Sequence, residues 1–161
     1  MEHYIKLFKG FGYAFRGIFH TILTERNMRI HLVCVCYMLG FLLLTDWFVL
    51  TRTDWALIVI ASVLVLASEL INTAVEKTVD LATAERHPLA KVAKDAAAGA
   101  VLVFAIGAVI VGLLVLLQPD AFRKLWTYFT TPPLGLAAFV LSLCPATLFI
   151  FFGFGKGKHH E

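Results

Sequence analysis

Four long apolar stretches, separated by short polar segments, dominate the chain. They predict membrane-spanning helices at about residues 31–50, 54–75, 95–117 and 133–154, each near the roughly 20 residues that a bilayer requires. The composition agrees, because 60% of the 161 residues are hydrophobic, whereas soluble domains contain about 45–50% apolar residues. The mean hydropathy is +0.82. We therefore predict an all-α integral membrane protein.

Residues 2–24 carry a different pattern. Apolar side chains recur there at steps of three and four residues, and most of the charged residues lie between them. This pattern is typical of an amphipathic helix that lies in the membrane interface instead of crossing it. The segment contains the glycine-rich run GFGYAFRG, but that run lacks the GxxxxGK[ST] pattern of a phosphate-binding loop. We expect a surface helix before the first span.

The basic residues are distributed unevenly between the two sides of the predicted spans. All but three of the 14 lysines and arginines fall on the side that holds the N-terminus and the loop between the second and third spans. The exceptions are Arg52, Arg123 and Lys124. Because cytoplasmic loops are enriched in basic residues, we predict that the N-terminus and this loop are cytoplasmic. Lipid headgroups suffice to explain the net charge of +3, so no nucleic-acid partner is expected.

The second predicted span ends in a stripe of polar side chains. Glu69, Asn72, Glu76 and Asp80 have the spacing i, i+3, i+7 and i+11, which places them on one face of a helix. Carboxylates at the edge of a hydrocarbon span repel each other and need a cation, a metal ion or a polar substrate to compensate them. The next helix begins with two lysines and an aspartate, Lys91, Lys94 and Asp95. This arrangement suits a metal-bound polyphosphate at a membrane surface.

Glu25 lies just before the first span, on the same predicted side as Glu76. By itself it could pair with Arg29, four residues further along a helix. Set beside Glu76, it is also a candidate metal ligand, because Mg²⁺ typically takes one or two protein carboxylates and completes its shell with phosphate oxygens and water. Both interpretations are consistent with the sequence.

These segments resemble the small prokaryotic lipid kinases of the diacylglycerol kinase/undecaprenol kinase family. The resemblance is carried by ERN at Glu25, by ELINTAVEKTVD from Glu69 to Asp80, and by HPLAKVAKDAAAGA from His87. The resemblance covers about residues 1–118. Within the family, this sequence is similar to the Gram-positive type, which phosphorylates undecaprenol. The enterobacterial type prefers diacylglycerol. We therefore expect a kinase domain at residues 1–118, and an extension at residues 119–161 that carries the fourth span.

The resemblance implies an ATP- and Mg²⁺-dependent kinase of a membrane lipid alcohol. It implies a homotrimer with active sites at the cytoplasmic face of a bacterial inner membrane, Glu69 as the general base, and Glu25 and Glu76 as metal ligands. The implied nucleotide contacts are Lys6, Tyr13, Glu25, Asn72, Glu76, Asp80, Glu85, Arg86, His87, Lys94 and Asp95. The implied contacts to the lipid substrate are Phe15, Phe19, Ile22, Arg29 and Glu69.

Several residues admit a simpler structural interpretation. Asn72 could form a hydrogen bond between helices instead of contacting nucleotide. Asp80 could pair with a basic neighbour across protomers, and His87, before Pro88, could cap a helix.

Other functions also remain open from the residues alone. A diacylglycerol kinase would use the same site. A small ion-conducting membrane protein would also place acids in a span, although here they cluster at one end. A scaffold protein with a decayed site is a third alternative.

Overall fold

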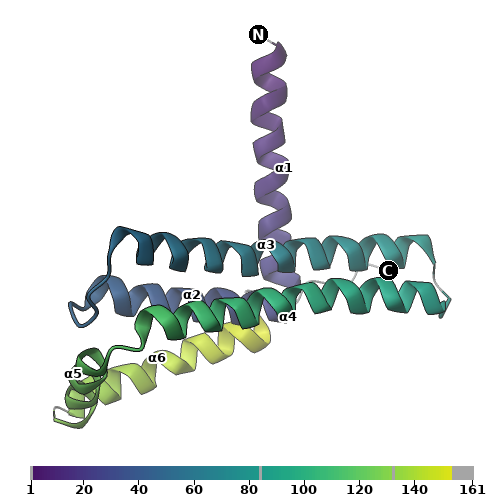
Figure 1. Ribbon diagram of the computed structural model, residues 1–161. Helices are drawn as coiled ribbons and strands as arrows, with labels where there is room; N and C mark the ends of the chain where they lie inside the picture. The colour runs from purple at the N-terminus through teal and green to yellow at the C-terminus, as the bar shows by residue number, and fades with distance from the viewer. Residues whose placement is uncertain (1, 84, 132, 154–161) are drawn as a thin grey trace.

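The computed structural model describes residues 2–83, 85–131 and 133–153, which form six helices and no strand (Figure 1). The helices are α1 (Glu2–Thr24), α2 (Arg26–Leu44), α3 (Arg52–Ala82), α4 (Pro88–Leu116), α5 (Pro119–Thr130) and α6 (Pro133–Phe152). Of these, α2, α3, α4 and α6 are long and apolar enough to cross a membrane. The predicted all-α fold with four spans is therefore confirmed.

The first span is shorter at its far end than the apolar run predicts. Helix α2 ends at Leu44, and the chain continues through Thr45 in an extended conformation. The backbone N–H of Val49 donates to the side-chain oxygen of Gln118 at 3.0 Å, and the Gln118 amide donates to the Val49 carbonyl at 3.1 Å. This side chain from the α4–α5 junction satisfies non-helical backbone groups, so the turn can include apolar residues up to Leu50.

The polar ends of α3 and α4 are helical beyond the predicted spans. Helix α3 continues to Ala82, so that the whole stripe from Glu69 to Asp80 is helical. Helix α4 begins at Pro88 and not near residue 95, because proline suits the first helical position. His87 is the N-cap, and its Nδ1 accepts a hydrogen bond from the Leu89 backbone N–H at 3.2 Å. The capping interpretation of His87 is thus confirmed.

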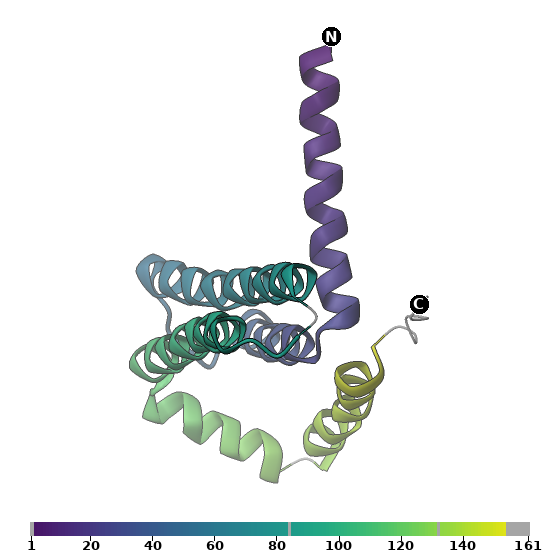
Figure 2. The same cartoon turned by 90° about the vertical axis from the view of Figure 1, so that its right-hand side faces the viewer.

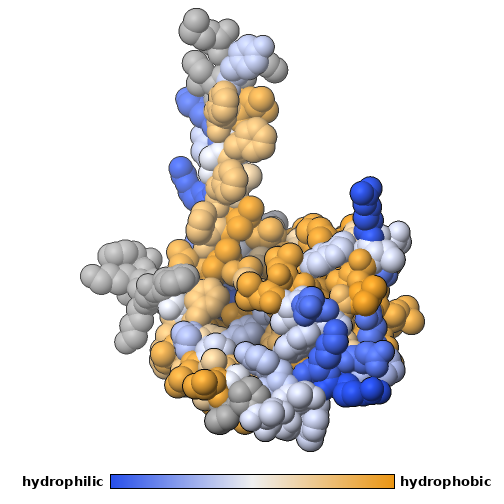
Figure 3. Space-filling model, turned by 90° about the vertical axis from the view of Figure 1, so that its left-hand side faces the viewer, coloured by the Kyte–Doolittle hydropathy of each residue, from blue (hydrophilic) through white to orange (hydrophobic). Residues whose placement is uncertain are grey.

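Helices α2, α3 and α4 lie side by side, whereas α1 runs across their direction (Figures 1 and 2). Helix α3 packs most extensively against α4, and α1 contacts only α2 and α3 among the described elements. The predicted helix at residues 2–24 is confirmed, and its apolar side, with Phe8, Phe15 and Phe19, is exposed (Figure 3). A helix in this orientation can lie along the interface when the other helices span the bilayer.

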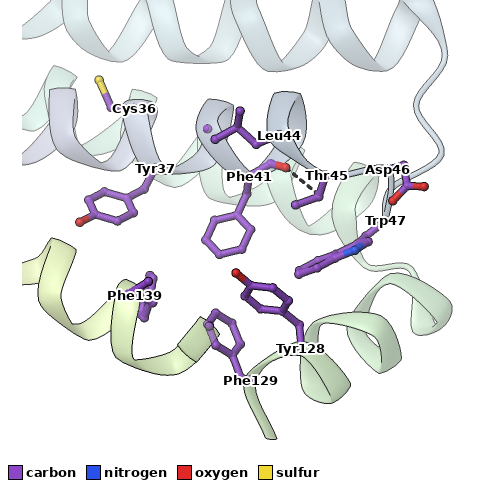
Figure 4. A pocket seen from close by; sticks show the side chains of 13 residues that line it. Cys36, Tyr37, Phe41, Leu44, Thr45, Asp46, Trp47, Tyr128, Phe129 and Phe139 are labelled. Atoms are coloured by element: carbon purple, nitrogen blue, oxygen red, sulfur yellow. Dashed lines mark hydrogen bonds between the residues drawn. The ribbon is translucent and has the colours of Figure 1, made fainter. Parts of the chain in front are cut away.

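Of the last two helices, α6 packs against α2, and α5 packs against α6. Helix α6 contacts α2 and α5, and an aromatic cluster joins the three elements (Figure 4). Neighbouring rings in this cluster lie 5.1–6.3 Å apart between centroids, within the range of favourable aromatic contacts. Its members are Tyr37, Phe41, Trp47, Tyr128, Phe129 and Phe139. They line a cavity of about 520 Å³.

The close approach of Gly135 to the Tyr128 ring predicts an effect of a single methyl group. In Gly135→Ala, the new Cβ would lie 2.7 Å from a Tyr128 ring carbon, and that ring is held between Trp47 and Phe129. We expect the free energy of unfolding in detergent to fall by about 1–3 kcal/mol. Gly112→Ala is the matched control, because its Cβ meets no atom within 4 Å. Equal stabilities of the two variants would contradict the described packing.

Candidate active site

Three side chains of the polar stripe, Glu69, Asn72 and Glu76, line a small cavity between α2, α3 and α4. Glu69 and Asn72 are only 2% and 6% exposed, and Glu76 is half-buried. The cavity measures about 250 Å³. Its lining consists of Asn27 and His31 from α2, of Glu69, Asn72 and Glu76 from α3, and of Ala98, Val101, Leu102 and Ala105 from α4. The two alanines on the α4 side leave room beside the carboxylates.

Two buried acceptors in this cavity have no hydrogen-bond partner among the described residues. The Asn72 amide donates to Oε1 of Glu76 at 3.0 Å within α3, so Asn72 bonds within its own helix and not between helices. Oε2 of Glu69 and Oδ1 of Asn72 are buried and accept no hydrogen bond from any described residue. Because an unpaired buried acceptor is costly, both atoms favour an incoming donor. The hydroxyl group of an alcohol is such a donor, and Glu69 could accept its proton.

Glu25 forms the junction between α1 and α2. It is the single residue between the two helices, with φ −98° and ψ 118°, so the chain turns sharply at this point. Its carboxylate accepts a hydrogen bond from the Thr24 hydroxyl at 3.1 Å and lies 3.8 Å from the Lys77 ammonium. The predicted pair of Glu25 with Arg29 is wrong, because the Arg29 guanidinium is turned towards backbone carbonyl groups.

The carboxylates of this region repel each other. Glu69 experiences the charge of both Glu25 and Glu76. Within the described part of the chain, no group of three or more His, Cys, Asp or Glu side chains is arranged to hold a metal ion. Mg²⁺, however, often takes one or two protein carboxylates and fills its shell with phosphate oxygens and water. Of the two predicted metal ligands, Glu76 lines the cavity between α2, α3 and α4, whereas Glu25 lies at the α1–α2 junction and does not line it. Carboxylate oxygens suit Mg²⁺, and the metal role of Glu25 and Glu76 stays a prediction.

A second cavity, of about 740 Å³, lies at the turn between α3 and α4. Six of the predicted nucleotide contacts line it, namely Asp80, Glu85, Arg86, His87, Lys94 and Asp95. Lys94 forms an ion pair with Asp80, so Asp80 does pair with a basic residue, but within one chain. Asp80 follows Glu76 by one helical turn, about 6 Å along the axis. The stripe on α3 therefore leads from one cavity to the other.

The predicted contacts on α1 lie away from both cavities. Lys6, Tyr13, Phe15 and Phe19 are exposed and line neither cavity. The Arg16 guanidinium lies 5.7 Å from the centroid of the Tyr13 ring. Within one chain, α1 extends away from α3 and α4 (Figure 1). Ile22, near the end of α1, is partly exposed, and its carbonyl accepts a hydrogen bond from Arg29.

Two cavity residues were missed from the sequence. Asn27 and His31 line the cavity beside Glu69, but His31 resembles an ordinary polar residue at the membrane interface. The available signal was their spacing, because residues four apart lie on one face of a helix. The spacing of Asn27 and His31 therefore predicts a common polar face at the start of the first span, as the spacing of the stripe does on α3.

The sequence of this chain is similar to those of known proteins. Residues 12–116 match the family described as prokaryotic diacylglycerol kinase. Undecaprenol kinase from Bacillus subtilis is 47% identical over 114 residues, which cover 70% of this chain and 89% of that protein. A diacylglycerol kinase from Synechocystis is 45% identical over 116 residues, covering 70% of this chain and 63% of that protein. A diacylglycerol kinase from Helicobacter pylori is 35% identical over 100 residues, covering 61% of this chain and 74% of that protein. The chain belongs to the prokaryotic diacylglycerol kinase family.

Proposed function

We propose that this chain, a membrane lipid kinase that uses ATP, phosphorylates undecaprenol. The choice of substrate is supported by the similarity to the Bacillus subtilis undecaprenol kinase. Diacylglycerol is the second candidate, because the relatives from Synechocystis and Helicobacter pylori are diacylglycerol kinases. The observation that carries the proposed kinase reaction is Oε2 of Glu69, which lies buried in the cavity between α2, α3 and α4 and accepts no hydrogen bond from the described residues.

In the proposed reaction, Glu69 is the general base. It accepts the proton of the lipid hydroxyl while the alcohol oxygen forms a bond to the γ-phosphorus of ATP. The bond from that phosphorus to the bridging β–γ oxygen breaks, and ADP leaves. Glu69 lies seven residues before Glu76, about 10 Å deeper along the helix axis. This depth suits a hydroxyl that arrives from the hydrocarbon side.

The nucleotide would occupy the cavity at the α3–α4 turn. Lys94 would add a cation near the phosphates, and Asp95, Glu85, Arg86 and His87 surround the same space. Phosphoryl transfer depends mainly on positioning and charge neutralisation. Glu25 and Glu76 would hold the Mg²⁺ ion that supplies this charge neutralisation.

A homotrimer is part of this proposal. Lys6 and Tyr13 are predicted nucleotide contacts, yet they lie on the part of α1 that extends from the bundle (Figure 1). A second copy would bring an α1 helix to the α3–α4 cavity of its neighbour. Phe15 and Phe19 would then border the lipid path, and Asn72 and Asp80 would face nucleotide from α3.

The proposed kinase unit is residues 1–118, with residues 119–161 appended to it. The family match ends at residue 116, just before α5 begins at Pro119. The basic residues support placing α1 and the α3–α4 turn on the cytoplasmic side of a bacterial inner membrane. This orientation gives the site access to ATP.

Lipid-dependent ADP release tests the proposal against the other classes of function. The purified protein in detergent micelles should release ADP from ATP and Mg²⁺ only when a lipid alcohol is added. A small ion-conducting protein or a scaffold would release none under any lipid condition. ADP release that is unaffected by lipid would contradict the kinase mechanism, because it would mean that water is the acceptor.

A further inference from the structure

Helix α6 is attached to α2 at three levels. At one end, the aromatic cluster joins Phe139 to Phe41. In the middle, the Tyr37 hydroxyl donates to the Ser142 hydroxyl at 2.8 Å. At the other end, Nε of Arg29 donates to the carbonyl of Ile150 at 3.0 Å. The third attachment lies at the end of α2 that adjoins α1.

Arg29 also holds the end of α1. Its Nη1 donates to the carbonyl of Ile22 at 3.2 Å and to that of Leu23 at 2.8 Å. Both carbonyls belong to the last turn of α1, and that of Ile150 belongs to the last turn of α6. Carbonyls at a helix C-terminus lack helical partners and carry partial negative charge. Arg29, a residue that is only 6% exposed, therefore joins the negative ends of two helices through its guanidinium.

This junction lies at the base of the part of α1 that projects from the bundle. Only Glu25 separates α1 from α2, and the contacts of α1 with the other described helices are confined to α2 and α3. Most of α1 extends beyond those contacts (Figure 2). A small change at the Arg29 junction is therefore amplified along the helix towards Phe19, Phe15 and Tyr13.

We propose that the fourth span positions the surface helix through Arg29, and so sets the productive binding of the lipid substrate. Arg29 is a positioning residue in this account, and α6 supplies one of its three carbonyl acceptors. This role goes beyond the proposed kinase reaction, because α6 lies outside the residues that match the family. Phosphate transfer serves here only as one of two readouts.

The test perturbs the junction from both sides. Arg29→Gln removes the guanidinium, and Arg29→Lys keeps a cation there. Gly153→Val acts from the α6 side, because Gly153 has φ +60° and its Cβ would lie 3.4 Å from Nη1 of Arg29. Valine is strained in that conformation, so the end of α6 should shift away from Arg29. Gly112→Val is the matched control at an open position on α4.

The first readout is the distance between α1 and α6. Spin labels at Lys9→Cys on α1 and at the native Cys144 on α6 report this distance by pulsed electron resonance, once Cys34 and Cys36 are replaced by serine. Labelled chains are diluted with unlabelled chains so that only distances within one chain are measured. We expect a narrow distribution in the parent, a broad or shifted one in Arg29→Gln and Gly153→Val, and an intermediate one in Arg29→Lys.

The second readout is a double-mutant cycle on lipid kinetics. Arg29→Gln and Gly153→Val should each raise the KM for the lipid alcohol about fivefold and change kcat less. The KM of the double variant should be close to that of each single variant, because both substitutions act on one junction. Unchanged distances in Gly153→Val, or effects on KM that multiply in the double variant, would overturn the inference. Loss of all lipid-dependent transfer in the parent protein would instead contradict the kinase proposal, and the distance measurement would still stand.

Discussion

Replacing Glu69 by glutamine is expected to lower kcat by about 10²–10⁴-fold, the typical contribution of a general base. Glutamine preserves the size of the side chain in the 250 Å³ cavity, but it cannot accept the proton of the lipid hydroxyl. Binding of ATP should persist, because the cavity proposed for the nucleotide lies further along α3 and at the α3–α4 turn. Steady-state transfer and nucleotide binding by calorimetry, measured on the same preparation, separate the two effects.

Asp120→Asn provides the control for loss of an acid. Asp120 lies on the exposed face of α5 and pairs with Arg123 at 3.7 Å, away from both cavities of the candidate site. Its replacement should leave kcat unchanged. Near-normal turnover in Glu69→Gln would remove Glu69 from the role of base.

Glu76→Gln is expected to weaken Mg²⁺ and nucleotide binding together. The amide oxygen of glutamine can still accept the hydrogen bond from Asn72, so the substitution removes charge and leaves the local contact in place. The Mg²⁺ concentration that gives half-maximal activity should rise by about 10–100-fold or more. Loss of a residue that only supports a metal ligand already weakens metal binding by about that factor. The KM for ATP should rise in the same direction. Titrations of activity with Mg²⁺ at several fixed ATP concentrations measure both.

Glu25→Gln should behave like Glu76→Gln if the two carboxylates share one ion. The structure gives the two residues different surroundings, since Glu25 lies 3.8 Å from Lys77 and Glu76 contacts Asn72. A common effect of both variants on the Mg²⁺ titration therefore points to the ion and not to a shared local contact. Superimposable titrations of Glu76→Gln and the parent protein would refute the ligand role.

The elements of the fold were predictable because their signals are local. The lengths of the apolar runs predict the four spans, and the steps of three and four residues predict α1. The spacing of Glu69, Asn72 and Glu76 predicts their common face, since helical periodicity alone determines it. The end of α2 was not predictable in this way, because the turn after Leu44 depends on Gln118, about 70 residues away along the chain.

Local sequence patterns also could not predict the parts of the candidate site that depend on tertiary contacts. His31 joins Glu69 only because α2 packs beside α3 and α4. The partners of Arg29 include Ile150, which is 121 residues away along the chain. An i, i+4 pairing with Glu25 was a reasonable local expectation, but the carbonyls at two helix ends compete for the guanidinium more effectively.

The most direct test of the central claim is a competition for phosphate. Undecaprenol and diacylglycerol are offered at equal surface fraction in detergent micelles, with labelled ATP and Mg²⁺, and the two phosphorylated lipids are separated and counted. We predict that most of the label enters undecaprenyl phosphate. Predominant labelling of phosphatidate would contradict the proposed substrate, and transfer to neither lipid would contradict the proposed reaction.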